Sequence, residues 1–164
     1  MMKKYVFILA FASLVLTACG SSGMEEAIEA GNVAFADEDY ETAMAQYQVA
    51  AAEEPAAAAP VYNLANVLYR QENYEQAQAS MQSAMLNADV TLTQQGHFNL
   101  GNAFYRAENY AAAVEEYKAA LRLNPDDLDA KVNLELALNQ LQQDEQEQEE
   151  QEEQQQDQQQ EEQE

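Results

Sequence analysis

Thiol and imidazole groups, which serve nucleophilic catalysis and zinc binding, are scarce in this sequence of 164 residues. It contains one cysteine, Cys19, and one histidine, His97. A single cysteine cannot form an internal disulfide, and a structural zinc site takes about four Cys or His ligands. No combination of hydroxyl, base and acid recurs near a special turn, and no glycine-rich phosphate loop is present. We therefore expect no enzyme active site and no metal site.

Cys19 follows a segment that is typical of a processing signal. Lys3 and Lys4 give it a positive start, and the apolar run 5–16 has 12 residues, whereas spanning a bilayer takes roughly 20 helical residues. The tetrapeptide LTAC at 16–19 resembles the lipobox of bacterial lipoproteins. This resemblance implies that the signal peptide 1–18 is removed and that the sulfur of Cys19 receives a diacylglyceryl group. A plain secretory peptide with an incidental cysteine is the alternative.

The consequence of that resemblance is an anchored protein on the extracytoplasmic side of a bacterial membrane. Two or more acyl chains hold a protein stably to a bilayer. Residues 19–23 would form a short flexible tether. The sequence leaves the choice between inner and outer membrane open. Apart from this lipid, no cofactor is expected.

The charge balance limits the partners of the protein. Thirty Asp and Glu stand against seven Lys and Arg, which gives a formal net charge of −23. Such a chain is repelled by nucleic acid phosphates and by anionic lipid headgroups. We therefore expect a protein partner and a membrane bound only through the lipid, and no nucleic acid.

An internal repeat governs the middle of the sequence. Asn32 recurs as Asn66, which lies 34 residues later, and again as Asn102, which lies another 36 residues on. The flanking strings NVAFADEDYETA, NVLYRQENYEQA and NAFYRAENYAAA agree. A 34-residue period is that of the tetratricopeptide repeat, and the chain resembles this family over residues 24–127. The matching rows are Gly31/Ala65/Gly101, Tyr40/Tyr74/Tyr110, Ala43/Ala77/Ala113 and Ala50/Ala84/Ala120.

The resemblance implies an all-α fold, a right-handed superhelix (solenoid) of three helix–turn–helix repeats with a C-terminal capping helix. The predicted repeats cover 24–57, 58–93 and 94–127, and the cap covers 128–141. The cap would use Val132, Leu134, Leu136, Leu138 and Leu141 to cover the end of the third repeat.

An acidic Gln/Glu-rich tail fills 142–164, with 12 Gln and 11 acidic residues. It has nothing apolar to bury, so we expect the last helix to run past Leu141 and then fray. Metal buffering by the tail carboxylates is an alternative, although no ligand spacing is recognisable there.

The helical pattern of each repeat predicts specific packing. Small residues at Gly31, Ala65 and Gly101 should let the second helix of each repeat approach the first closely. His97 stands where the neighbouring copy has Val61, so it is predicted to be a packed core residue rather than a ligand or base. The residues that precede the second helices are suited to the N-cap: Asp39, Asn73 and Asn109.

Asparagine occupies one position in the first helix of all three repeats. Asn is less favourable than Ala inside a helix by roughly 0.5–0.7 kcal/mol, so three of them at one position require a reason. In the tetratricopeptide family this face lines a concave groove that binds extended peptides, and Asn contacts the peptide backbone. The alternative is that these Asn side chains only bond between helices. The groove candidates are Asn32, Asn63, Asn66, Tyr69, Arg70, Asn99, Asn102, Tyr105 and Arg106.

Two arginines give the groove face a positive character. Arg70 and Arg106 lie beside aromatic residues and would suit an acidic segment of a partner. They also stand in the last turn of a helix, where a cation is favoured by about 0.3–1 kcal/mol. The family's carboxylate clamp, however, has lysines where this chain has Ile28 and Gln95. Recognition of a free C-terminal carboxylate is therefore not expected.

A narrower resemblance concerns the end of the chain. The stretch 97–143, with its NLELA helix, and the Gln-rich tail resemble the tetratricopeptide proteins of Bat (Bacteroides aerotolerance) operons. Those proteins accompany membrane proteins with von Willebrand factor A domains and a MoxR-type ATPase.

The function expected from all these features is a lipid-anchored, non-enzymatic scaffold at the cell envelope. The alternatives are a lipoprotein subunit of an outer-membrane assembly or secretion machine, and an enzyme accessory with a metal-buffering tail.

The lipid anchor predicts a simple outcome for Cys19→Ala. This variant loses the only acceptor sulfur, so it should leave the membrane fraction and incorporate no labelled palmitate. Membrane fractionation after palmitate labelling measures both, with Ser21→Ala as a control that keeps the acceptor. Unchanged labelling of Cys19→Ala would exclude a lipoprotein.

Overall fold

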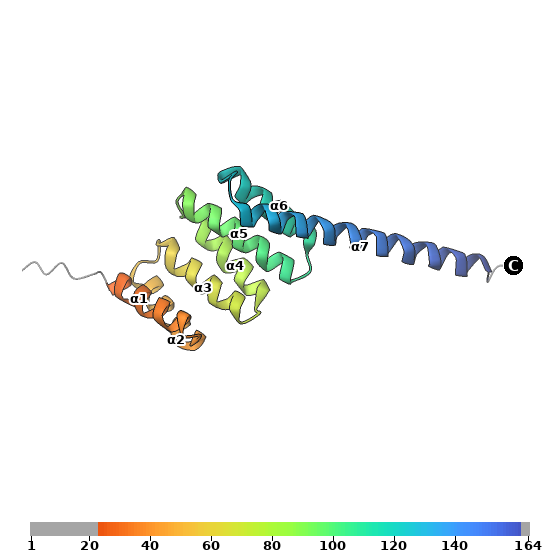
Figure 1. Ribbon diagram of the computed structural model, residues 1–164. Helices are drawn as coiled ribbons and strands as arrows, with labels where there is room; N and C mark the ends of the chain where they lie inside the picture. Colours follow the sequence, from red (N-terminus) through yellow and green to blue (C-terminus); the bar gives the residue numbers. More distant parts are fainter. Residues whose placement is uncertain (1–22, 162–164) are drawn as a thin grey trace, which may run out of the picture.

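The computed structural model describes residues 23–161, and this part of the chain contains seven helices and no strand (Figure 1). The predicted signal peptide, Cys19 and the tether as far as residue 22 lie outside the described residues. The all-α prediction is confirmed for the described part. The helices are α1 (Gly23–Ala36), α2 (Tyr40–Glu53), α3 (Ala58–Arg70), α4 (Tyr74–Met85), α5 (Val90–Arg106), α6 (Tyr110–Leu123) and α7 (Leu128–Glu161).

The helices form three pairs that stack in sequence order, followed by α7. Each helix packs mainly on its neighbours in the chain: α1 on α2, α3 on α4, α5 on α6, with α2 on α3 and α4 on α5 joining the pairs. The result is a solenoid of helix–turn–helix units, as the repeat predicted. None of the helices in residues 23–161 is long and apolar enough to cross a membrane.

The turn inside each pair has the same geometry three times. Glu38, Glu72 and Glu108 have φ values of 61°, 62° and 60°, in the left-handed region. In the first turn the amide of Glu38 donates to the carbonyl of Phe35 and that of Asp39 to Ala34, which is a Schellman motif. A left-handed non-glycine residue costs about 1 kcal/mol, so the tight turn is maintained at some expense in stability.

Two of the three predicted N-caps make the expected side-chain bond. Asp39 Oδ1 accepts from the amide of Thr42 at 3.1 Å, and Asn109 Oδ1 accepts from Ala112 at 3.2 Å. Asn73 occupies the same position before α4 but makes no capping bond. Capping therefore helps to define where α2 and α6 begin, while α4 starts without it.

Close approach within a pair depends on a small residue facing a large one. A Cβ added to Gly31 would lie 2.5 Å from the ring of Tyr47, and one added to Gly101 would lie 2.6 Å from the ring of Tyr117. Tyr47 and Tyr117 are 2% and 1% exposed, so neither ring has room to move. The prediction of close helix approach at the glycine row is confirmed.

His97 is not the core residue that its repeat position predicted. Its side chain is 26% exposed, and Nδ1 lies 2.7 Å from Oε2 of Glu116 on α6. Val61, the equivalent residue in the second repeat, is also only half-buried. The position lies at the margin of the helix pair, where a polar partner is available, and this explains why the prediction was wrong.

The first part of α7 covers the third repeat. Ala130 and Ala137 are fully buried, and Leu134 packs against the cluster that contains Val114 and Tyr117. The other predicted cap residues are less engaged: Leu141 is half-buried, and Val132, Leu136 and Leu138 are exposed. They are exposed because no further helix packs on α7 within the described part of the chain.

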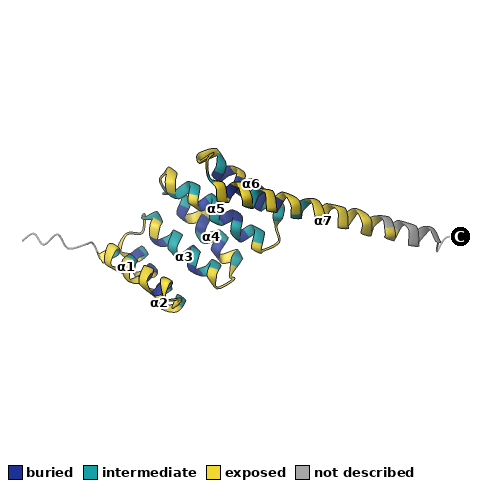
Figure 2. Ribbon diagram, viewed as in Figure 1, coloured by how far each residue is buried: buried dark blue, intermediate teal, exposed yellow. Residues whose placement is uncertain are grey.

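The last helix runs past Leu141 into the tail, as expected from the sequence. The helix extends to Glu161, and nearly all of its described side chains beyond Leu141 are exposed (Figure 2). Gln and Glu have good intrinsic helix propensity, and here it prevails over like-charge repulsion. A straight helix of 34 residues measures roughly 50 Å, so α7 projects well beyond the repeats.

The close contact between Gly101 and the ring of Tyr117 predicts that a Gly-to-Ala substitution within this helix lowers stability. Gly101→Ala should destabilise the protein by about 1–2 kcal/mol, because overpacking against Tyr117 outweighs the gain in helix propensity. The double variant Gly101→Ala with Tyr117→Met reproduces the Ala65/Met81 pair of the second repeat and should recover much of that loss. Chemical denaturation measures both. A single variant as stable as the parent would show that the contact does not limit helix approach.

Candidate functional site

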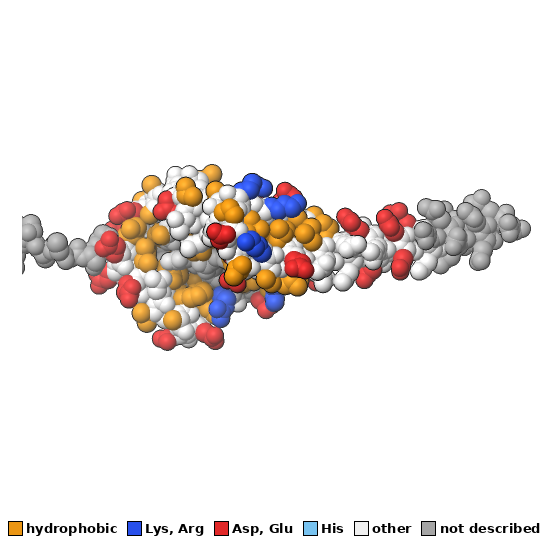
Figure 3. Space-filling model, turned by 45° about the horizontal axis from the view of Figure 1, so that its top comes forward, with side chains coloured by type: hydrophobic (Ala, Val, Ile, Leu, Met, Phe, Trp, Pro, Cys, Tyr) orange, Lys and Arg blue, Asp and Glu red, His pale blue; other side chains and the backbone are white. Residues whose placement is uncertain are grey.

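All nine predicted groove residues line one surface made by α1, α3 and α5. Three adjoining hollows follow one another along it, and neighbouring hollows share lining residues. The first lies at Asn32 and Asn63, the second at Asn66 and Asn99, and the third at Tyr105 and Arg106. We call this surface the Asn groove. Figure 3 shows hydrophobic side chains gathered on the repeat domain, and acidic side chains both on the repeats and along the described part of the projecting α7.

Tyrosines from the second helices hold two of the groove asparagines. The hydroxyl of Tyr47 donates to Oδ1 of Asn32 at 2.8 Å, and that of Tyr117 donates to Oδ1 of Asn102 at 2.8 Å. Burial raises the pKa of the Tyr117 phenol above its usual value, so the hydroxyl keeps its proton and remains a donor. These bonds orient the amides within a repeat.

A second set of bonds joins one repeat to the next. Nδ2 of Asn99 donates to Oδ1 of Asn66 at 2.9 Å and to the hydroxyl of Tyr62 at 2.8 Å. Nδ2 of Asn133 on α7 donates to Oδ1 of Asn102 at 2.9 Å. Asn63 is the counterpart of Asn99 in the repeat, but it makes no such bond. The first and second repeats therefore lack the link that joins the later ones.

The amide nitrogens of the groove row remain available. Nδ2 of Asn32 and Asn102 makes no hydrogen bond to any of residues 23–161, and the amide of Asn66 has a hydrogen bond to the Tyr62 side chain, while each Oδ1 is bonded as described. An Asn side chain carries two N–H donors on that nitrogen. The hydrogen bonds within the protein are thus accepted by the Oδ1 atoms of the three asparagines. N–H groups on Nδ2 are left to donate to a carbonyl or carboxylate of a ligand. The same asparagines can therefore both join the helices and bind a ligand.

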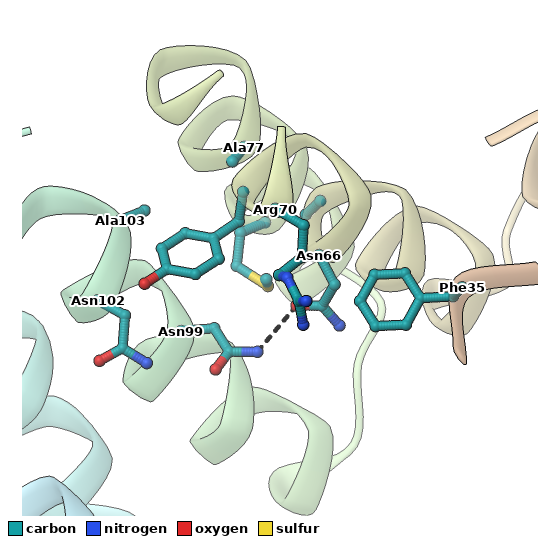
Figure 4. A pocket seen from close by; sticks show the side chains of 10 residues that line it. Phe35, Asn66, Arg70, Ala77, Asn99, Asn102 and Ala103 are labelled. Carbon is teal, nitrogen blue, oxygen red and sulfur yellow. Dashed lines mark hydrogen bonds between the residues drawn. The ribbon is translucent and has the colours of Figure 1, made fainter. Parts of the chain in front are cut away.

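The central hollow is an apolar pocket in the middle repeat. It has a volume of about 160 Å³, and Met81, Ala77 and Ala65 supply buried apolar side chains to it. Asn66 and Asn99 point toward one another beside it and are joined by a hydrogen bond (Figure 4). We call this hollow the Met81 pocket.

The two arginines also serve the contacts between repeats. Arg70 lies 5.7 Å from the ring centroids of Phe35 and Tyr40, and its Nη2 is 3.4 Å from Oε1 of Glu38. In the next repeat Arg106 Nε donates to the hydroxyl of Tyr74 at 3.2 Å. Each guanidinium thus packs on aromatic residues of the preceding repeat, and both arginines are exposed at the edge of the groove.

The sequence identified the groove row but missed residues that shape it. Met81 and Asn133 were not among the candidates, although both follow from the repeat spacing. Met81 takes the position of Tyr47 and Tyr117, and Asn133 lies 34 residues after Asn99. In residues 23–161 there is no cluster of three or more His, Cys, Asp or Glu that could hold a metal ion.

Comparison with known families and structures agrees with this geometry. The tetratricopeptide repeat profile matches residues 28–89, 62–128 and 98–159. No curated protein sequence matches the chain.

Solved repeat domains match the fold. The TPR domain of Arabidopsis OM64 is 24% identical, with a TM-score of 0.65, over 70% of this chain and 93% of that one. The first TPR domain of human RPAP3 is 20% identical, with a TM-score of 0.71, over 77% and 98%. The second TPR domain of human RPAP3, solved in complex with the HSP70 peptide SGPTIEEVD, is 22% identical, with a TM-score of 0.65, over 70% and 94%.

The contrast between Asn99 and Asn63 yields a matched pair of variants. Asn99→Ala removes two hydrogen bonds and should lower the free energy of unfolding by about 1–2 kcal/mol, even after the gain in helix propensity. Asn63→Ala loses no bond and should leave stability unchanged or slightly higher. Equal losses in chemical denaturation of the two variants would argue against the bond from Asn99 as a link between repeats.

Proposed function

Since the chain belongs to the tetratricopeptide-repeat family, we propose that it is a non-enzymatic scaffold that binds an extended segment of a partner protein in the Asn groove. The observation that carries this proposal is the arrangement of the three asparagine amides. Their carbonyl oxygens are bonded internally, and their Nδ2 donors are left along one surface. An extended backbone offers carbonyl acceptors to such a row. The peptide complex of the related human domain supports the same use of the groove.

The partner segment is proposed to be internal rather than a free C-terminus. Ile28 and Gln95 carry no charge where the clamp of peptide-binding relatives would need cations. The only cations lining the three hollows of the groove are Arg70 and Arg106. They favour a segment with acidic side chains, although Glu38 already contacts Arg70.

Lipidation of Cys19 would place this scaffold on the extracytoplasmic face of a bacterial membrane. The support is the sequence around Cys19, with its charged start and its short apolar run. Cys19 precedes Gly23, the first residue of α1, by four residues in the sequence, so a lipid on Cys19 would hold the groove near the membrane through a short tether.

A Bat-type complex with von Willebrand factor A-domain proteins is our proposal for the cellular setting. It rests on the NLELA segment and the Gln-rich tail. In the structure both belong to α7, where NLELA packs on the third repeat and the tail projects as an acidic helix. A projecting charged helix suits a spacer that keeps neighbouring proteins apart.

The proposed binding in the Asn groove predicts that substitutions of its residues weaken binding of the partner while the protein stays folded. A crosslinked pull-down of the native lipoprotein first identifies the partner, and binding is then measured with the purified partner. Asn66→Ala with Asn102→Ala should weaken binding at least tenfold per folded molecule. Arg70→Ala with Arg106→Ala should weaken it more at low salt than at high salt, because screening reduces exposed charge attraction.

Leu86→Ala is the control, because Leu86 is 83% exposed and lies outside the groove. Thermal melts of the same samples give the folded fraction. If the asparagine pair melts earlier while binding per folded molecule is unchanged, the row is structural and the groove proposal fails.

A further inference from the structure

The middle repeat departs from its neighbours at one buried position. Fifteen residues after the groove asparagine, the first and third repeats have Tyr47 and Tyr117, whereas the second has Met81. Met81 is 3% exposed, so it is as much a core residue as the tyrosines. It carries no hydroxyl, and Asn66 therefore receives its bond from Asn99 alone.

This replacement coincides with the apolar pocket of the groove. The Met81 pocket has a volume of about 160 Å³. Cavities of about 150 Å³ in protein cores can hold a benzene ring. The space is therefore sufficient for one phenyl or isobutyl group.

The rim of the pocket differs from its interior in chemistry. Asn66 and Asn102 present Nδ2 donors beside it, and Arg70 adds a cation. No carboxylate lines the pocket. A backbone carbonyl on either side of an apolar side chain would find donors there, whereas a lysine or arginine side chain would meet the cation Arg70, with which Glu38 is already paired.

From this geometry we propose that the Met81 pocket binds one large apolar side chain, Phe or Leu, of the partner segment that lies in the Asn groove. The inference rests on the proposed function and adds its specificity: the segment is selected for an apolar anchor at the middle repeat. The hollows in the first and third repeats differ in lining, because each has a tyrosine hydroxyl bonded to its asparagine where the Met81 pocket has a thioether.

The neighbouring repeats supply a variant, called the filled variant below, that places a tyrosine ring and hydroxyl where the Met81 pocket has the methionine side chain. Ala65→Gly with Met81→Tyr recreates the Gly–Asn–Tyr arrangement of Gly31, Asn32 and Tyr47. A tyrosine there would have its hydroxyl near Asn66, and the glycine would give the ring room. The double variant should fold, because two of the three repeats already use this combination. Met81→Leu is the matched control that keeps the pocket apolar.

The probe is a phage-displayed library of random 12-residue peptides, panned on the full chain in detergent micelles. Enriched peptides are synthesised with and without replacement of their apolar residue by Ala, and Kd is measured by fluorescence anisotropy. Peptides with Phe or Leu should be enriched, and the filled variant should bind them roughly ten- to a hundredfold more weakly. Replacing the apolar residue should cause a similar loss, and the two losses should not add. Met81→Leu should bind within a few-fold of the parent.

Other outcomes distinguish a failure of the proposed Met81 pocket from a failure of the proposed binding in the Asn groove. Peptides that depend on Asn66 but show no apolar preference and bind the filled variant equally would overturn the pocket and leave the proposed function standing. Absence of any peptide that depends on Asn66 would overturn both. A change of oligomeric state in the filled variant, measured by sedimentation, would assign the pocket to a second copy of the chain and refute a partner anchor.

Discussion

Close contact between the first and second helix of each repeat is the constraint on which the rest of this structure depends. The contact exists because a glycine or alanine on one helix faces a large buried side chain on the other. Gly31 leaves room for the ring of Tyr47, and Gly101 does the same for Tyr117. Interiors pack at nearly crystalline density, so helix spacing and side-chain size are determined together. The left-handed glutamates in the turns allow the chain to reverse within this short distance.

The same contact connects packing with recognition. A tyrosine that fills the space above glycine also brings its hydroxyl to the groove asparagine of its own repeat. The amide is then oriented with its donors outward. Where the pair is Ala65 with Met81, the hydroxyl is absent and the hollow beside Asn66 is lined mostly by apolar side chains. A change of one core pair therefore alters the chemistry of the surface above it.

Contacts between repeats are less uniform than the repeat sequence. Asn99 joins the second and third repeats and Asn133 joins the third to α7, but Asn63 makes no corresponding bond. Arg70 packs on Phe35 and Tyr40 at the first junction, and Arg106 packs on Tyr74 at the next. In a solenoid each repeat contacts only its neighbours, so such local differences set the stability of each junction separately. The apolar residues left exposed on α7 follow from the same rule, because within the described chain no helix stacks on that end.

The sequence by itself determined the helix pairs and the row of groove residues, because a 34-residue period and helical spacing of apolar residues are local properties. Tertiary structure decided what those residues do. His97 had a core position in the repeat pattern, yet it lies at a margin where Glu116 reaches it. The pocket at Met81 and the bond from Asn133 require distances between helices that no spacing along the chain specifies. The run of the last helix past Leu141 was expected from the sequence, but how far it continues depends on the balance of helix propensity and charge repulsion, which the pattern does not show.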